Sequence, residues 1–375
     1  TVSGANTIIV IICLLWLFSG DYKAKYNQIM SSNLMIASVV FYCLHVIGML
    51  WTEDLLWGLH ILHKMWYFLL LFPILFNIVQ RKYINYYLSA FLIAIALTEI
   101  ASYLVWFELV EPFKKATVKN PTPFMSHISY NPILAMAIYL VYYNVFIKAK
   151  LNLLKFFIYS FFAISMTINM FITGGRAGHV MYFVMLTILI FQFFSKDKIK
   201  ALVAVLVIIP LIFFSAYQTS YIFHQRVDLA VNNTMNYEFA KNTSVGQRIT
   251  FAINSWEVIK ENPIIGIGTG DFPSEYKKIN QINTPQVPTT TNPHNMYTLI
   301  TMQLGLIGLV SMLSIFYYQI KLSFYSSNRF IKDLGIALPL MFLVIMWSDS
   351  YILGHYTTLM FVFFSSFLYK DFEKS

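Results

Sequence analysis

The stretch Ala201-Leu-Val-Ala-Val-Leu-Val-Ile-Ile-Pro-Leu-Ile-Phe-Phe-Ser-Ala-Tyr217 carries no charge and is almost entirely apolar. Its length is close to the ~20 residues with which an α-helix crosses the hydrocarbon core of a bilayer. In the whole chain of 375 residues, 58% are hydrophobic and only 11% are charged, whereas ordinary soluble domains carry about 25% charged residues. This composition excludes a soluble globular protein. It indicates an all-α polytopic membrane protein in which residues 201–217 form one span.

Ten further apolar runs have the length and character of membrane spans. Together with residues 201–217 they predict about eleven spans, and one more helix before residue 1 would bring the count to twelve. The last two runs are separated only by Ser348-Asp349-Ser350 and could form one interrupted unit. The ten runs are residues 5–19, 33–51, 65–80, 84–107, 128–147, 154–173, 177–194, 294–320, 334–348 and 351–369.

Basic residues gather in short clusters between alternate pairs of apolar runs, as the positive-inside rule describes for cytoplasmic loops. These loops are therefore predicted to face the cytoplasm, although the intervening loop 108–127 is also basic. Because the net charge of +9 comes largely from these clusters, we expect the lipid bilayer as a partner and no nucleic acid. The clusters lie at residues 23–25, 81–82, 148–155, 196–200, 321–332 and 370–374.

A long polar segment, residues 218–293, follows the run 201–217 and is predicted to lie on the outer side of the membrane. Loops of this length are uncommon in compact proteins unless they have a function. The chain is thus divided into residues 1–217 with the first spans, the outer segment 218–293, and residues 294–375 with the last spans.

Within the outer segment, residues 247–261 are predicted to form an amphipathic helix that Asn262-Pro263 ends. The glycines of residues 264–270 then permit a tight turn against the bilayer surface. Their Gly-x-Gly-x-Gly spacing is a weak nucleotide-binding signal here, because no strand precedes it. The apolar face of the helix carries Ile249, Ala252, Ile253, Trp256 and Ile259, and the polar face carries Asn254, Glu257 and Lys260.

His294 lies where the outer segment enters the next span, in the sequence Asn292-Pro293-His294-Asn295. Asn292 can serve as the N-cap with Pro293 at the first helical position, which places His294 in the first turn. The positive end of the helix dipole would favour a neutral imidazole there, which can act as a general base. The alternative is a polar histidine that only solvates the helix end.

Two arginines are candidates for binding an anion. Arg176 follows Gly174-Gly175 between two apolar runs, at the expected start of a helix whose N–H groups would assist its guanidinium in binding phosphate. Arg248, in Gly246-Gln247-Arg248, opens the amphipathic helix. The alternatives are an interfacial arginine reaching lipid headgroups at Arg176 and an exposed surface arginine at Arg248.

Other polar residues near the outer ends of spans are weaker candidates. Lys64 could contact a phosphate or could simply reach the lipid interface, and His127 could line the site. Asp349 and His355, near the last turn, are expected to be structural. The sequence contains no recognisable set of metal ligands, so we expect neither metal nor cofactor.

These motifs, taken in order, resemble the O-antigen ligase family. The resemblance rests on an arginine after a small-residue turn, on Gly-Gln-Arg followed by Trp-x-x-Ile and Pro-Ile-Ile-Gly-Ile-Gly-Thr-Gly-Asp-Phe, and on Pro-His-Asn-x-Tyr leading a span. It is strongest over residues 170–310, and the early loop from Trp51 to Lys64 also resembles the family. The chain has Thr-Gly-Gly-Arg where relatives often have Ser-Arg.

The resemblance implies a GT-C-like helical fold of about a dozen spans and a metal-independent, inverting glycosyltransferase. Such enzymes take a glycan from undecaprenyl diphosphate and pass it to an acceptor on the periplasmic face. By resemblance, Arg176, Arg248 and His294 match the catalytic residues of the family. Both arginines would bind the diphosphate, and His294 would deprotonate or orient the acceptor hydroxyl. The substrate-binding candidates are Arg176, Arg248, Lys64, His127, Gln247 and Asn295.

The acceptor separates three activities that share these residues. A ligase modifies lipid A-core, a polymerase extends a second lipid-linked glycan, and a protein O-oligosaccharyltransferase modifies serine or threonine. The late position of the outer segment favours the ligase. From a different class, a transporter or flippase of a lipid-linked anion would use the arginines as substrate ligands, but it would often show two related halves, and none is visible in this sequence.

Overall fold

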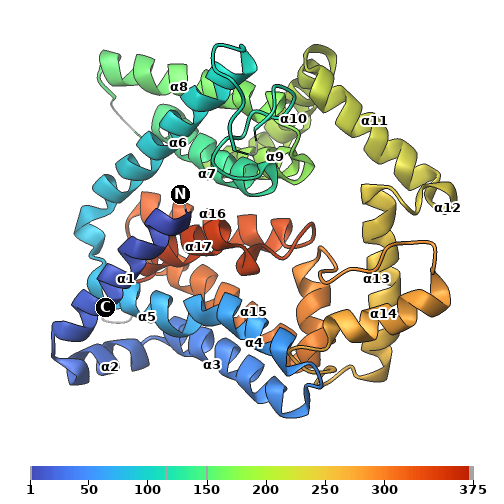
Figure 1. Cartoon of the computed structure of the whole chain (residues 1–375). Coiled ribbons are helices and arrows are strands. Elements are labelled where there is room, and N and C mark those ends of the chain that lie inside the picture. The colour runs from blue at the N-terminus through green and yellow to red at the C-terminus, as the bar shows by residue number, and fades with distance from the viewer. Residues whose placement is uncertain (1, 115, 149–150, 371–375) are drawn as a thin grey trace. The chain divides into compact units, whose positions relative to one another are not determined.

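The computed structural model describes residues 2–114, 116–148 and 151–370. Throughout these residues the secondary structure consists of helices joined by turns and loops, with no strand (Figure 1). The predicted all-α polytopic class is therefore confirmed. Two basic residues of the predicted cytoplasmic clusters, Lys150 and Lys374, lie outside the described residues.

Seven helical stretches of the described chain are long and apolar enough to cross a membrane, or eight if the bent pair α1 and α2 forms one span. The predicted runs 128–147, 334–348 and 351–369 also form helices but do not meet this criterion. The helices of runs 334–348 and 351–369 have only 17 and 14 residues. In the helix of run 128–147, tyrosines and asparagines reduce the mean hydropathy. The seven stretches are Asn33–Trp51, Leu55–Ile78, Arg81–Trp106, Leu153–Ile172, Arg176–Phe193, Lys198–Thr219 and Met296–Phe324.

The chain forms two compact units, which are described separately. Unit 1 comprises residues 1–81 and 233–375, and unit 2 comprises residues 82–232. The helices of unit 1 are α1 (Val2–Phe18), α2 (Tyr22–Met30), α3 (Asn33–Gly48), η1 (Met49–Trp51), α4 (Leu55–Trp66), η2 (Tyr67–Leu71), α5 (Phe72–Ile78), α12 (Tyr237–Ala240), α13 (Ser244–Glu261), α14 (Phe272–Asn283), α15 (Met296–Phe324), α16 (Arg329–Ile345), η4 (Tyr351–Leu353) and α17 (His355–Leu368).

The long helix α15 forms the centre of unit 1, where it packs on α3, α13 and α16. It is broken at Gly305, whose φ of 60° and ψ of −158° are accessible only to glycine. The break frees backbone groups that would be costly to leave unpaired in a membrane. The glycine-rich turn 263–268 binds them: Ile267 N–H donates to Met302 O at 2.9 Å, and Leu306 N–H donates to Pro263 O at 2.9 Å.

The segment just after the glycine-rich turn binds the early loop that contains Glu53 and Asp54. The carboxylate of Asp271 accepts hydrogen bonds from the backbone N–H groups of Glu53, at 2.9 Å, and Asp54, at 2.8 Å. Gly266 and Gly268 adopt φ values of 70° and 116°, as the predicted tight turn requires. The turn therefore packs into a broken span and joins two segments that are far apart in the sequence.

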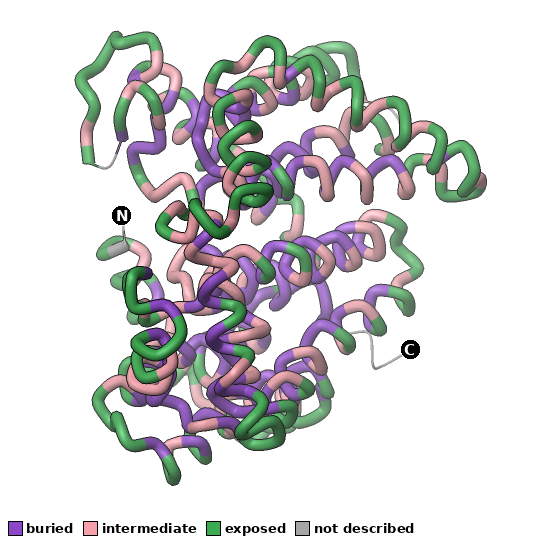
Figure 2. The backbone as a smooth tube through the Cα atoms, turned by 90° about the vertical axis from the view of Figure 1, so that its right-hand side faces the viewer, coloured by how far each residue is buried: buried purple, intermediate pink, exposed green. Residues whose placement is uncertain are grey.

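The predicted helix 247–261 is confirmed as α13, which starts slightly earlier at Ser244. Figure 2 shows buried and exposed residues side by side along many of the helices. On α13 the predicted apolar face is buried only in part, because Ile259 is buried while Ile253 and Trp256 are about half exposed. The polar Asn254 is fully buried: its amide donates to Thr284 Oγ1 at 2.7 Å, and Tyr276 and Asn280 of α14 lie beside it. Hydrogen bonding to α14 therefore helps to orient α13.

Unit 2 is built around α7, which packs against both α8 and α9. Close approach of α7 and α9 depends on Gly178, because a Cβ at this position would lie only 2.0 Å from Cβ of Asn131. In addition, α6 packs on α7 and α8, and α9 packs on α8 and α10. The helices of unit 2 are α6 (Ile84–Trp106), α7 (His127–Phe146), α8 (Leu153–Ile172), α9 (Arg176–Phe193), α10 (Lys198–Thr219) and most of α11 (Tyr221–Met235), while η3 (Arg81–Tyr83) bridges the boundary.

Candidate functional site

His294 precedes α15 rather than lying in its first turn. The N-cap is Asn295, whose side chain accepts a hydrogen bond from Thr298 N–H at 3.1 Å, so the predicted cap at Asn292 is wrong. Asn292 instead accepts from the backbone N–H of His294 at 3.0 Å. This local turn holds His294 in a left-handed conformation with φ of 53°, which is unfavourable for a residue with a side chain. Such strain is typical of functional sites.

The imidazole of His294 faces the carboxylate of Asp349, in the loop between α16 and η4. Nδ1 of His294 lies 3.2 Å from Oδ1 of Asp349, outside good hydrogen-bond geometry, and has no hydrogen-bond partner among the described residues. The same oxygen accepts hydrogen bonds from Ser350 N–H at 2.7 Å and from the Asn292 amide at 3.1 Å. Asp349 is thus fixed beside the ring, and a small rotation would complete a hydrogen bond of the kind that often tightens only with substrate.

The charge state of Asp349 follows from its neighbours. Burial alone would raise the pKa of this carboxyl, but contact with His294, the hydrogen bond from Ser350 and the charge of Arg248 together hold it below its ordinary value. Asp349 is therefore a carboxylate at neutral pH and can only accept hydrogen bonds. It favours a proton on Nδ1 of His294, which leaves Nε2 to accept a proton from another group.

Helix α13 brings two further side chains to this site. The ring of Phe251 stacks on the imidazole of His294 with centroids 6.2 Å apart. Arg248, almost one turn earlier, has a buried Nε without a hydrogen-bond partner among the residues that the structure describes. A buried guanidinium N–H is costly to leave unpaired, and an anion is its natural acceptor. Arg248, His294 and Asp349 therefore form a site with a proton acceptor beside an anion-binding group.

In unit 2, Arg176 is the first residue of α9, as predicted from the sequence. The turn before it is closely packed, because a Cβ at Gly175 would lie 2.8 Å from the amide nitrogen of Asn131 and 2.9 Å from His127 O. The hydroxyl of Thr173 donates to Asn131 Oδ1 at 2.9 Å. The turn is therefore held against α7, and the N–H groups at the start of α9 lie beside the guanidinium.

His127 belongs to the surroundings of Arg176. Asn120 bridges the two segments, since its Oδ1 accepts from Gly174 N–H at 3.1 Å and its amide nitrogen lies 2.7 Å from Nδ1 of His127. Burial lowers the pKa of His127, and the charges of Arg226 and Arg176 lower it further. The neutral imidazole therefore lies next to two guanidinium groups.

The other three predicted site residues lie in unit 1. Lys64 borders a pocket of about 500 Å³ that is also lined by His63 and His355. The side chain of Gln247 donates to Asn242 O at 3.2 Å, within its own segment, and Asn295 caps α15. Their roles in substrate binding stay predictions.

Two residues of these surroundings were not found from the sequence. Asp349 was expected to be structural, although its position in a polar break between two apolar runs was the available signal. Arg226 lies on α11 in the polar segment and carried no distinguishing pattern. Within the described ranges, no group of three or more His, Cys, Asp or Glu side chains is suited to hold a metal ion.

Comparison with protein families agrees with the motifs. Residues 161–313 match the family model described as O-antigen ligase, a segment that includes Arg176, Arg248 and His294. No curated protein sequence matches the chain. The match supports an O-antigen ligase family assignment for this part of the chain, residues 161–313.

Proposed function

We propose that this protein is an O-antigen ligase, which moves a glycan from undecaprenyl diphosphate to lipid A-core at the periplasmic face of the bacterial inner membrane. Family membership supports a membrane enzyme of the O-antigen ligase and polymerase type. The donor, the acceptor and the side of the membrane are part of the proposal. The observation that carries it is the contact between His294 and Asp349 beside Arg248.

In the proposed reaction, the acceptor hydroxyl oxygen attacks the anomeric carbon of the donor glycan. The hydroxyl proton passes to Nε2 of His294, while the bond between the anomeric carbon and the diphosphate oxygen breaks. Undecaprenyl diphosphate leaves with the bonding electron pair, and attack opposite to it inverts the anomeric centre. Asp349 keeps the imidazole in the tautomer that can accept this proton and stabilises the imidazolium that forms.

The arginines would stabilise the departing diphosphate. Arg248 has a buried N–H that awaits an acceptor, and negative charge grows on the leaving group as the bond breaks. Arg176, in unit 2, combines its guanidinium with the amide groups at the start of α9. Guanidinium groups can in this way neutralise the charge that a divalent cation neutralises in other transferases.

The test is transfer by the purified full chain in detergent or nanodiscs. An undecaprenyl diphosphate-linked glycan is offered with lipid A-core, with a second lipid-linked glycan or with a serine-containing peptide, and the products are resolved by mass. A ligase modifies lipid A-core and a polymerase extends the second glycan. Modification of the peptide alone would identify the protein as a protein O-oligosaccharyltransferase and not a ligase. If none of the three acceptors is modified while the donor crosses vesicle membranes, the protein is a transporter.

A further inference from the structure

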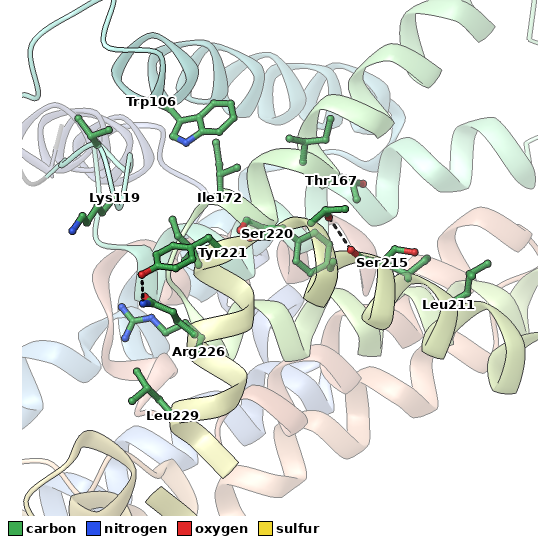
Figure 3. A pocket seen from close by; sticks show the side chains of 18 residues that line it. Trp106, Lys119, Thr167, Ile172, Leu211, Ser215, Ser220, Tyr221, Arg226 and Leu229 are labelled. Atoms are coloured by element: carbon green, nitrogen blue, oxygen red, sulfur yellow. Dashed lines mark hydrogen bonds between the residues drawn. The ribbon is translucent and has the colours of Figure 1, made fainter. Parts of the chain in front are cut away.

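Unit 2 contains a chamber of about 1040 Å³ (Figure 3). Its walls come from the ends of α6 and α8, from α10 and from the start of α11. Most of the lining side chains are apolar, and α10 buries only 11% of its apolar window within the structure. Since α10 is a candidate span, its exposed face meets lipid chains. An apolar chain can therefore enter the chamber from the bilayer.

The polar end of this chamber is positively charged. Arg226 of α11 and Lys119 of the loop before α7 both line it, and Figure 3 shows them together at the end opposite Leu211. No acidic residue lines the chamber. Arg226 is only partly exposed, so an anion bound to it would be partly removed from water, where charge-assisted hydrogen bonds are stronger.

Arg226 is also close to the turn that carries Arg176. A Cβ at Gly174 would lie 3.1 Å from Nη2 and 3.4 Å from Nε of Arg226. A residue larger than glycine would therefore push the guanidinium of Arg226 away from this turn. The hydroxyl of Ser220 donates to Phe171 O at 2.7 Å and fixes the start of α11 against the end of α8. The position of Arg226 beside the turn at Gly174 is therefore fixed by the packing of unit 2. The lowered pKa of His127, to which both guanidiniums contribute, agrees with this arrangement.

We infer that the chamber binds a lipid-linked diphosphate, with Arg226 and Lys119 at the phosphates and the apolar walls around the first isoprenoid units of the chain. This inference rests on the proposed function and adds Arg226 as a donor-binding residue next to Arg176. The Arg226 guanidinium and the Lys119 ammonium, both at one end of the chamber, suit two adjacent phosphate groups better than the single phosphodiester of an ordinary phospholipid.

The experiment measures binding, not transfer, with the purified full chain in nanodiscs. The probes are undecaprenyl diphosphate without glycan, undecaprenyl monophosphate, phosphatidylglycerol and inorganic diphosphate. Wild type should bind undecaprenyl diphosphate most tightly. Arg226→Ala should weaken that binding about ten- to one-hundred-fold, as loss of a hydrogen bond to a charged group predicts, and Arg226→Lys should weaken it less. Lys200→Ala, an exposed change on α10 that does not line the chamber, is the matched control and should bind like wild type.

A second variant tests the apolar part of the chamber. Ser215 lines it and is exposed, so Ser215→Trp should fill space without disturbing the packed interior. Binding of undecaprenyl diphosphate should fall several-fold, while binding of inorganic diphosphate stays as in wild type. Equal affinity of wild type for phosphatidylglycerol and undecaprenyl diphosphate would overturn the inference in favour of an ordinary lipid site. Unchanged binding in Arg226→Ala would overturn it as well.

The result can be separated from that of the transfer assay. If wild type transfers glycan and Arg226→Ala binds the diphosphate lipid normally, the inference fails and the proposed function stands. If wild type transfers no glycan but the binding differences appear, the lipid site stands and the proposed function fails.

Discussion

Nδ1 of His294 lies 3.2 Å from Oδ1 of Asp349, although helices α15 and α16 separate the two residues in the chain. The pair joins the end of the outer segment to the loop that follows α16. A backbone hydrogen bond from Met296 N–H to Met346 O, at 2.8 Å, fixes the same two segments to each other. The imidazole and the carboxylate therefore meet because the backbone around them is paired.

Replacing Asp349 with asparagine should reduce turnover far more than donor binding. The amide keeps the shape of the side chain but cannot favour the productive tautomer or stabilise the imidazolium, which costs ~10²- to 10⁴-fold in kcat. Steady-state kinetics of glycan transfer would measure this loss, with KM for the donor near the wild-type value. Turnover in Asp349→Asn equal to wild type would remove Asp349 from the mechanism.

The lowered pKa of Asp349 also predicts a pH dependence of stability. A carboxyl whose folded pKa lies below its unfolded value contributes stability above the unfolded pKa, and loses it as pH falls through the folded pKa. The ordinary value is 3.8, so the contribution should be complete from about pH 5 upward and vanish only below the ordinary value. The difference in thermal stability between wild type and Asp349→Asn in detergent should be present at pH 5 and shrink as pH falls towards 3. A difference that grew as pH fell would contradict the assignment.

Substitution of His294 by alanine should abolish transfer and leave binding of undecaprenyl diphosphate within about twofold, because the ring removes a proton and does not hold the phosphates. His60→Ala is a suitable control, since His60 is an exposed histidine of the same unit, on α4. Donor binding by fluorescence and product formation by mass spectrometry would be measured on the same preparations. Full activity of His294→Ala would exclude His294 as the general base.

Substitutions of Arg248 should show whether catalysis needs only its positive charge or also the fixed direction of its N–H groups. Arg248→Ala removes the guanidinium next to Asp349 and should lower kcat/KM by ~10²- to 10³-fold, the range for one preorganised donor to a developing anion. Arg248→Lys keeps the charge but loses the fixed direction of the N–H groups, so it should recover only part of the activity. Kinetics at several salt concentrations would check this. Equal activity of the two variants would show that direction is unimportant.

The break in α15 makes a prediction about stability. A Cβ at Gly305 would lie 2.2 Å from the backbone carbonyl of Ile264, in a conformation that only glycine adopts readily. Gly305→Ala should therefore lower the apparent Tm well beyond the effect of Gly20→Ala. Gly20 also has a positive φ, of 66°, but a Cβ there meets nothing within 4 Å, so its substitution costs only about 1 kcal/mol of backbone strain. Similar Tm values for both variants would mean that the turn 263–268 does not pack tightly into the break.

Much of the fold follows from the sequence because the bilayer imposes simple demands. Residues 201–217 have no means of satisfying their backbone groups in hydrocarbon other than a helix, and α10 forms there. Hydropathy likewise placed α9 after Gly175, and the Asn262-Pro263 signal placed the end of α13. Neither signal predicted the side of α13 that packs, because the hydrogen bonds of Asn254 to α14 outweigh the burial of Ile253 and Trp256.

The membrane class, the apolar helices and the candidates Arg176, Arg248 and His294 could be predicted from the sequence alone, since hydropathy and short motifs are local properties. The contact of Asp349 with His294 and the position of Arg226 beside the turn of Gly174 follow only from the folded structure. Both contacts join segments that are distant in the chain, and their partners are selected by helix packing and by the pairing of freed backbone groups. No local pattern encodes such a choice, because it depends on where several helices end relative to one another.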